Sequence, residues 1–145
     1  MTIRLANEME TDYILKLTGQ VIEESTIGYS INNVQSGYNM FLPLIRKGAY
    51  YIVDEESGCL KGWALLGLER NVMTGKTFGN LFHLYVFPGN RNNGIGKNLI
   101  KAAIQNLKAS GIDTIQLNVF TGNSAKSLYE KLGFRSISNI MEYNF

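Results

Sequence analysis

Residues 89–101, GNRNNGIGKNLIK, are the residue types from which proteins build anion-binding loops. They stand between an apolar run and residues at helical spacing, which predicts a strand-to-helix loop. The first amides of a helix have no partner within the helix, and aligned peptide dipoles add positive charge there. Gly94 and Gly96 would let an anion approach the backbone, and Arg91 could add a bidentate contact. The loop predicts a phosphate or pyrophosphate site, although a turn that needs glycine only for its dihedral angles would look the same.

Spacing argues against two familiar phosphate loops. A Walker A loop needs glycine, four residues and then Gly-Lys-Ser/Thr, whereas here Arg91 holds the first position and Asn98 the last. The dinucleotide fingerprint GxGxxG would need glycine at Leu99, and it normally follows the first strand of a domain. We therefore do not expect ATP hydrolysis or NAD binding.

Composition limits the class of protein. The chain has 145 residues, of which 45% are hydrophobic and 18% charged, as expected for a single globular domain over residues 1–145. A net charge of +2, with the basic residues scattered, gives no reason to expect a nucleic acid or a membrane as partner. The single Cys59 cannot form an intramolecular disulfide or a cysteine-based metal site. With no signal-like or membrane-spanning apolar run, we expect a cytoplasmic protein without a metal.

The first part of the chain is expected to supply one strand and two helices. Residues 2–5 alternate as a strand, and 7–21 show helical spacing after an N-cap signal. The polar residues 24–36 predict a loop. A second helix is expected over about 37–47, where Pro43 would delay its start or kink it.

Strands and helices alternate in the rest of the chain. The expected strands are 49–54, 60–69, 80–87, 113–120 and 134–145, and the expected helices run from 95 to 107 and from 125 to 132. The order is β-α-α-β-β-β-α-β-α-β. This predicts the α/β class, with a mixed α+β sheet in one layered domain and a right-handed βαβ unit around the glycine loop.

Two motifs resemble those of a known family. LYVFPGNRNNGIGKNLI resembles the acetyl-CoA-binding signature of the GNAT family of N-acetyltransferases, and NVFTGNSAKSLYEKLGFRS resembles that family's second motif. The element order is also similar. The resemblance is sharp over about residues 80–135 and implies a single-domain GNAT-like fold that moves an acetyl group from acetyl-CoA to an amine.

The resemblance also implies where acetyl-CoA binds. Backbone groups near Leu84, Tyr85 and Val86 would pair with the pantetheine arm as if it were an added strand. The pyrophosphate would be held by the loop, and Asn123 would contact the cofactor arm. The loop residues so implied are Arg91, Asn92, Asn93, Gly94, Ile95, Gly96 and Lys97.

The reaction sets its own requirements. The amine must lose a proton before or during attack, and a backbone N–H must face the developing oxyanion. The leaving thiolate is best protonated by a nearby acid. The resemblance implies Tyr129 for this role, and a phenol suits because its ordinary pKa of about 10 lies above the roughly 8.5 of a thiol. The alternative is that Tyr129 only packs on its helix.

The general base is less clear from the sequence. Many relatives carry glutamate or histidine where this chain has Asn80 and Phe82. His83 is one residue out of that register, and a one-residue step on a strand changes the face. A β-bulge could re-aim it, so His83 is a candidate base, and Glu23, Glu24 or ordered water are alternatives.

The acceptor site is expected along segments 22–40 and 66–79, where Glu23, Glu24, Tyr29 and Tyr38 could hold a small-molecule or peptide amine. Each could equally be a solvated loop residue. The alternative to an enzyme is an acyl-CoA-binding sensor or regulatory domain without turnover. A second subunit could cover the edge left by the short final strand, which would make a homodimer.

Overall fold

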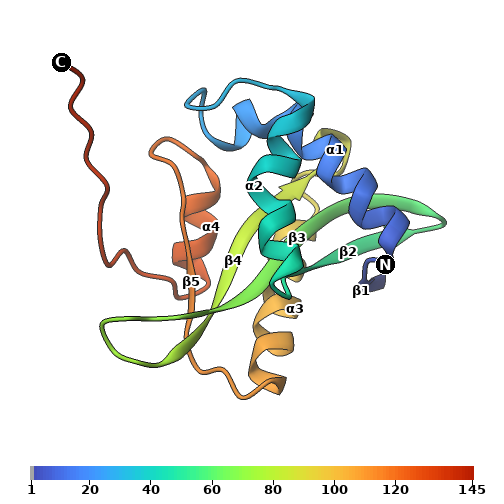
Figure 1. Ribbon diagram of the computed structural model, residues 1–145. Coiled ribbons are helices and arrows are strands. Elements are labelled where there is room, and N and C mark those ends of the chain that lie inside the picture. Colours follow the sequence, from blue (N-terminus) through green and yellow to red (C-terminus); the bar gives the residue numbers. More distant parts are fainter. Residues whose placement is uncertain (1) are drawn as a thin grey trace.

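A mixed five-stranded sheet in the order β1-β2-β3-β4-β5 forms the middle layer of the computed structural model, which describes residues 2–145 (Figure 1). The first four strands pair antiparallel, and the last pairs parallel with β4. The strands are β1 (Thr2–Leu5), β2 (Tyr50–Glu56), β3 (Cys59–Arg70), β4 (Thr77–Val86) and β5 (Ile115–Leu117). The predicted mixed sheet and its parallel pair are confirmed.

Helices cover both faces of the sheet. On one face, α1 (Glu8–Ser25) and α2 (Val34–Arg46) enclose a core that includes Trp63. On the other face, α3 (Ile95–Ala109) and α4 (Ala125–Lys131) enclose a second core that includes Leu81. Alternate side chains of each strand pack into the two cores, as the two-residue period of a strand requires. No helix within residues 2–145 is long and apolar enough to cross a bilayer.

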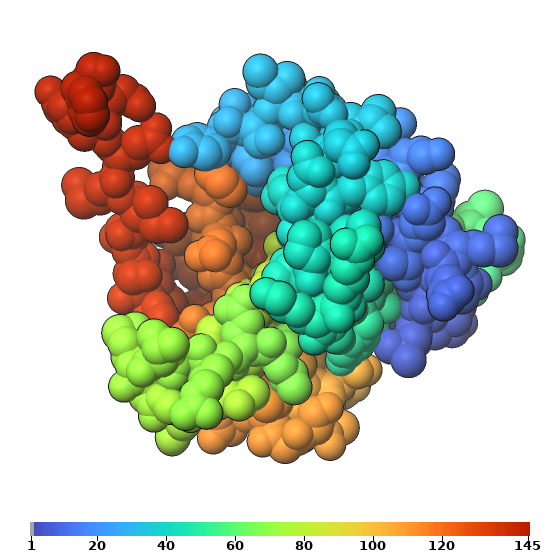
Figure 2. Space-filling model, viewed as in Figure 1, coloured from blue at the N-terminus to red at the C-terminus, as the bar shows by residue number. Residues whose placement is uncertain are grey.

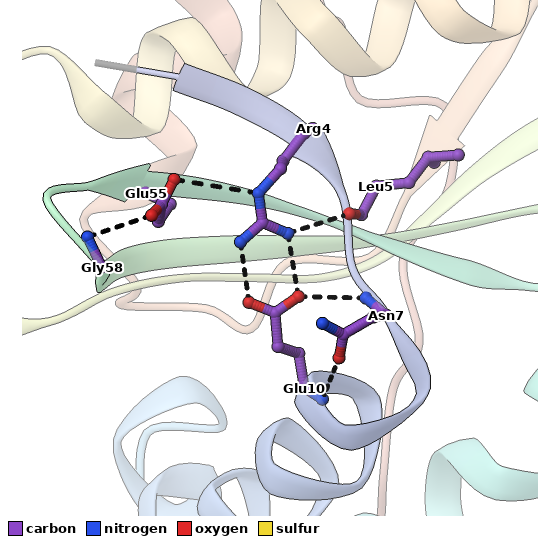
Figure 3. A network of polar contacts seen from close by, with 6 residues as sticks. All are labelled: Arg4, Leu5, Asn7, Glu10, Glu55 and Gly58. Carbon is purple, nitrogen blue, oxygen red and sulfur yellow. Dashed lines mark hydrogen bonds and ion pairs between the residues drawn. The ribbon is translucent and has the colours of Figure 1, made fainter.

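A polar network fixes the start of α1 against the sheet (Figure 3). The Asn7 side chain accepts a hydrogen bond from the Glu10 amide at 2.8 Å, and the Glu10 carboxylate accepts one from the Asn7 amide at 3.0 Å. Arg4 donates to both Glu10 oxygens, at 2.8 and 2.9 Å, and its Nε lies 3.8 Å from Glu55 on β2. The predicted N-cap is thus confirmed, and it also links β1, α1 and β2.

The helices α1 and α2 approach closely because two glycines lie between them. A Cβ at Gly37 would collide with the backbone oxygen of Leu15, and a Cβ at Gly19 would lie 2.7 Å from the Val34 carbonyl oxygen. The helix α2 begins at Val34, where the Asn33 side chain caps it, rather than near residue 37 as expected. Pro43 lies inside the helix, near its end.

Two strand predictions fail at the end of the chain. The strand predicted over 113–120 pairs only over residues 115–117. The strand predicted over 134–145 is wrong, since these residues carry no strand and 135–145 are exposed. Alternating side chains satisfy the strand pattern, but a strand also needs a partner for its backbone groups.

Candidate active site

Strands β4 and β5 diverge where the site was expected. They pair only over Gly79–Leu81 and Ile115–Leu117, while β4 continues to Val86. On its other side β4 remains paired with β3 up to Val86. The edge of β4 that faces β5 therefore has no strand partner along 82–86, the stretch that contains the predicted Leu84, Tyr85 and Val86, and an extended ligand could pair with its free backbone groups there.

The loop after β4 has the geometry expected of an anion-binding loop. Asn92 and Gly94 have positive φ angles of 64° and 79°, and Gly94 is the N-cap of α3. No side chain caps this helix, so the amides of Ile95, Gly96 and Lys97 have no side-chain acceptor at the cap. A Cβ at Gly94 would meet nothing within 4 Å, so the loop is open there. These residues fit the pyrophosphate of a CoA-type cofactor.

Arg91 points toward α1 instead of toward the first turn of α3. Its Nε donates to the Val86 carbonyl oxygen at 2.8 Å, and its Nη1 lies 2.6 Å from a Glu24 carboxylate oxygen. The guanidinium also stands 5.3 Å from the centre of the Tyr85 ring. Arg91 thus connects the loop to the end of α1, a contact between residues far apart in sequence.

Ser25, the last residue of α1, is a functional candidate that the sequence did not indicate. Its hydroxyl lies 3.1 Å from Nε2 of His83, and its carbonyl oxygen accepts from the Asn123 side-chain amide at 3.2 Å. The Asn123 side-chain oxygen accepts from the Ala125 amide at 2.9 Å. Asn123 therefore ties the start of α4 to the end of α1 across the space between β4 and the segment after β5. A lone serine in a polar stretch gives no signal of such contacts.

A β-bulge turns His83 toward this junction. His83 stands opposite Leu65 and Leu81 opposite Leu66, so Phe82 is an extra residue on β4. The His83 ring consequently stacks on Phe41 of α2, with ring centres 5.5 Å apart. The bulge considered from the sequence is confirmed, and it brings His83 to the face covered by α1 and α2.

The contacts of His83 define its protonation. The Trp63 Nε1–H donates to Nδ1 at 3.1 Å, and because an indole nitrogen can only donate, Nδ1 must be the acceptor. The proton of the neutral ring is then on Nε2, which donates to the Ser25 hydroxyl. Burial lowers the pKa of His83 to about 4. This arrangement does not favour His83 as a general base, and it does not activate Ser25 as a nucleophile.

Tyr129 lies in the core between α4, β4 and α3. It is 8% exposed and shares an apolar cluster with Leu81 and Ile95. Its ring packs edge-on against Phe134, with centres 5.9 Å apart. Burial raises the pKa of Tyr129 to about 12, so the phenol is protonated at neutral pH and can act as a proton donor.

The expected acceptor residues do not gather in one place. Glu24 pairs with Arg91, whereas the Tyr38 hydroxyl donates to the Asp12 carboxylate at 2.8 Å. Asp12 lies thirteen residues before Ser25 on α1, about 20 Å along a helix. Glu23 is exposed, and its amide donates to the Asn32 side chain at 2.8 Å.

Tyr29 lies in an aromatic and acidic cluster that the sequence did not indicate. Its ring is 5.5 Å from that of Phe120, centre to centre, and its hydroxyl donates to the Glu142 carboxylate at 2.6 Å. Across residues 2–145, no three His, Cys, Asp or Glu side chains are grouped as a metal site.

Solved structures of other proteins share this fold. The chain resembles a putative acetyltransferase from Pyrococcus furiosus, with a TM-score of 0.80 and 23% identity over 99% of both chains. It also resembles a predicted acetyltransferase of Clostridium acetobutylicum determined with acetyl-CoA, with a TM-score of 0.77 and 19% identity over 99% of this chain and 95% of that one.

A curated relative gives a shorter match. A segment of 57 residues is 40% identical to the ribosomal protein bS18-alanine N-acetyltransferase of Haemophilus influenzae, and it spans 39% of each protein. The match therefore covers about two fifths of the relative. The model of the acetyltransferase (GNAT) family matches residues 19–134. This match takes in most of the chain, including β4, the loop, α3 and α4, and the chain belongs to the acetyltransferase (GNAT) family.

Proposed function

We propose that this chain transfers an acetyl group from acetyl-CoA to a primary amine of a small molecule or peptide, with both substrates bound together. The observation that carries the proposal is the open edge of β4. The same strand leads into the start of α3, which no side chain caps. It also supplies Leu81 to the apolar cluster that contains Tyr129. The proposed binding edge and anion site thus follow one another along the chain, and Tyr129 packs in the core that the same strand supplies.

Each part of the site has a distinct role in the proposal. Backbone groups of Leu84–Val86 pair with the extended cofactor arm, and the amides at the start of α3 bind the pyrophosphate. Acetyl-CoA supplies an activated acetyl thioester when bound. Phe82 has no partner on β3 because of the bulge, and in the proposal its backbone N–H would stabilise the negative charge that develops on the reacting carbonyl. Tyr129 donates its proton to the departing sulfur.

His83 acts in this proposal as a positioning residue. A neutral imidazole that donates to Ser25 fixes the direction of the serine hydroxyl, which then can accept or pass on a proton at the end of α1. The amine proton leaves through Ser25 and ordered water, because the low pKa of His83 gives the ring little affinity for it.

A peptide amino terminus is the acceptor class we favour. The named activity of the curated relative acts on an alanine of a ribosomal protein. In this chain the cluster of Tyr29, Phe120 and Glu142 combines aromatic faces with a carboxylate, which suits an ammonium group before it loses its proton.

The first test compares ligand binding and turnover. Acetyl-CoA at 100 times its Kd should add about 2.7 kcal/mol to the free energy of unfolding and raise Tm by several degrees, whereas ATP and NAD should not. Release of CoA should then require a peptide with a free N-terminal alanine and stop with the same peptide acetylated in advance. No shift with acetyl-CoA or CoA would refute the cofactor assignment, and a shift without turnover on any amine would favour the sensor alternative.

Tyr129→Phe tests the acid role. The variant keeps the ring that packs on Phe134 but removes the proton donor. We expect kcat to fall about 100-fold, the low end for general acid catalysis, with the Kd for acetyl-CoA unchanged. Tyr13→Phe, at an exposed tyrosine of α1, is the matched control and should keep full activity. Equal kcat values for the two variants would assign Tyr129 to packing alone.

A further inference from the structure

The helix α1 ends without the residues that usually stabilise the end of a helix. The described residues of its last turn include Glu23 and Glu24 but no basic side chain, although the carbonyl end of a helix carries partial negative charge. Ile27, which follows the Thr26 cap, has a φ of 52°, a left-handed conformation that suits glycine and is strained for a β-branched residue. The sequence of α1 therefore holds its own last turn only weakly.

Two contacts from other parts of the chain hold this turn in place. Arg91, in the loop after β4, lies 2.6 Å from a Glu24 carboxylate oxygen and brings a positive charge to the end of α1. Asn123 donates at 3.2 Å to the Ser25 carbonyl oxygen, which has no partner within the helix. The end of α1 is thus held by the segments that follow β4 and β5, and Figure 2 shows the light blue residues after α1 beside the orange segment that leads into α4.

The Arg91 side chain is itself held by three contacts within the chain. Its Nη1 pairs with Glu24, its Nε donates to the Val86 carbonyl oxygen at 2.8 Å, and its guanidinium stands 5.3 Å from the centre of the Tyr85 ring. Tyr85 and Val86 are the last two residues of β4. Because a guanidinium is planar, its donors have fixed directions, so Arg91 sets the spacing between the end of β4 and the end of α1.

This ion pair serves placement more than stability. The exposed fractions of the Arg91 and Glu24 side chains are 36% and 54%, and water screens a pair so exposed. The pair does determine where the next residue lies. Ser25 follows Glu24 directly, and its hydroxyl meets Nε2 of His83 at 3.1 Å. A displaced helix end would separate these two atoms.

We propose that Arg91 is a positioning residue for the acceptor side of the reaction and is not a ligand of the cofactor's pyrophosphate. It holds Ser25 against His83, so the path by which the amine loses its proton is in place before the acceptor binds. The pyrophosphate is left to the backbone amides at the start of α3, which no side chain caps. This inference rests on the proposed function, because Ser25 has this role only if an amine is acetylated.

A double-mutant cycle tests the role in turnover. The natural chain is compared with Arg91→Gln, Glu24→Gln and the double variant, using a peptide with a free N-terminal alanine. We expect kcat to fall about tenfold in each single variant and no further in the double variant, because all three lose the same contact. The matched control is Glu56→Gln, which removes the carboxylate of the Lys61–Glu56 pair, itself 53% exposed, and should keep the natural kcat.

Cofactor affinity separates a positioning residue from a pyrophosphate ligand. We expect the Kd for CoA, measured by calorimetry, to stay within about threefold of the natural value in both single variants, with Tm without ligand unchanged. If Arg91 bound the pyrophosphate, Arg91→Gln would weaken CoA binding by about tenfold or more, and Glu24→Gln would strengthen it by releasing the guanidinium. Either of these changes in Kd would overturn the proposal, as would a natural kcat in Arg91→Gln.

Hydrogen exchange without cofactor tests the contact apart from the reaction. The Gly28 amide donates to the Glu23 carbonyl oxygen at 2.8 Å, and the Ile27 amide donates to that of Glu24 at 3.2 Å. We expect both amides to exchange about ten times faster in Arg91→Gln and Glu24→Gln, with the middle of α1 unchanged. Unchanged exchange at the end of α1 would overturn the proposal even in an active enzyme. Faster exchange in a chain that acetylates no amine would refute the proposed function and with it the role of Arg91, so the two failures are distinguishable.

Discussion

At the residue scale, His83 shows how burial and a donor-only neighbour determine protonation. Its folded pKa of about 4 lies below the ordinary 6.5. The unfolded chain therefore binds more protons between these values, and stability should fall as pH drops from 6.5 to 4, by on the order of 3 kcal/mol. Urea unfolding across this window, for the natural chain and for His83→Gln, measures the effect. A variant with the same pH dependence as the natural chain would show that His83 titrates normally.

Glu10 gives a second and lower pH window. The hydrogen bonds from Arg4 lower the pKa of Glu10 from 4.5 to about 2, with the Asn7 amide contributing next. The unfolded carboxyl protonates first, so its stabilising contribution is complete above pH 4.5 and declines as the pH falls toward 2. Glu10→Gln should be less stable than the natural chain at pH 6, and the difference should shrink by pH 3. A constant difference would mean that charge plays no part.

Residue contacts were predictable only where they are local. The Asn7–Glu10 cap and the open loop at Gly94 follow from residue type and short spacing. The Arg91–Glu24 pair joins residues 67 positions apart, and Ser25 and His83 are separated by 58. Nothing in their immediate sequence specifies such partners, because only the packing of α1 on the sheet brings them together.

At the scale of elements, the first turn of α3 offers a test that separates folding from binding. A Cβ at Gly96 would lie 3.6 Å from Leu128 and 3.8 Å from Val86, which are ordinary contacts. Gly96→Ala should therefore fold at least as stably as the natural chain, because alanine restricts the unfolded chain.

In the proposed pyrophosphate site, the same methyl group would crowd the space between the first turn of α3 and the end of β4 that the cofactor must enter. We expect the Kd for CoA to rise tenfold or more, measured by calorimetry, while Tm without ligand is unchanged or higher. Gln105→Ala, on the exposed side of the same helix, should leave both quantities as they are. Unaltered CoA binding by Gly96→Ala would place the pyrophosphate elsewhere.

Helices and strands were predicted correctly where the local pattern of apolar residues and glycines specifies them without a distant partner. The helices α3 and α4 and the strand β4 follow from periodicity and glycine stops. The bulge at Phe82 could not be derived, because it depends on how β4 matches β3. The strand expected over 134–145 failed for a similar reason: its pattern is present, but these residues pair with no strand of the described structure.

At the scale of the whole molecule, residues 135–145 provide a simple probe of local order. Arg135 is exposed and is the only lysine or arginine after Lys131, so trypsin acting there releases residues 136–145. These residues lie in no helix or strand, so this cut needs no prior unfolding, whereas a cut after Lys101 within α3 does. In the natural chain, cleavage after Arg135 should be at least ten times faster than cleavage after Lys101, as followed by mass spectrometry. Equal rates would indicate that residues 135–145 are as well protected as α3.

The divergence of β4 from β5 places an unpaired strand edge inside the molecule rather than on its rim. On the rim, such an edge attracts other polypeptides and promotes aggregation. Here the Asn123–Ser25 hydrogen bond and the helix α4 stand beside it, so folded neighbours are kept out. A thin, flexible chain that carries its own amide groups can still enter. In the proposed function, the edge would therefore admit a narrow arm that carries amide groups and exclude a partner as broad as a second sheet.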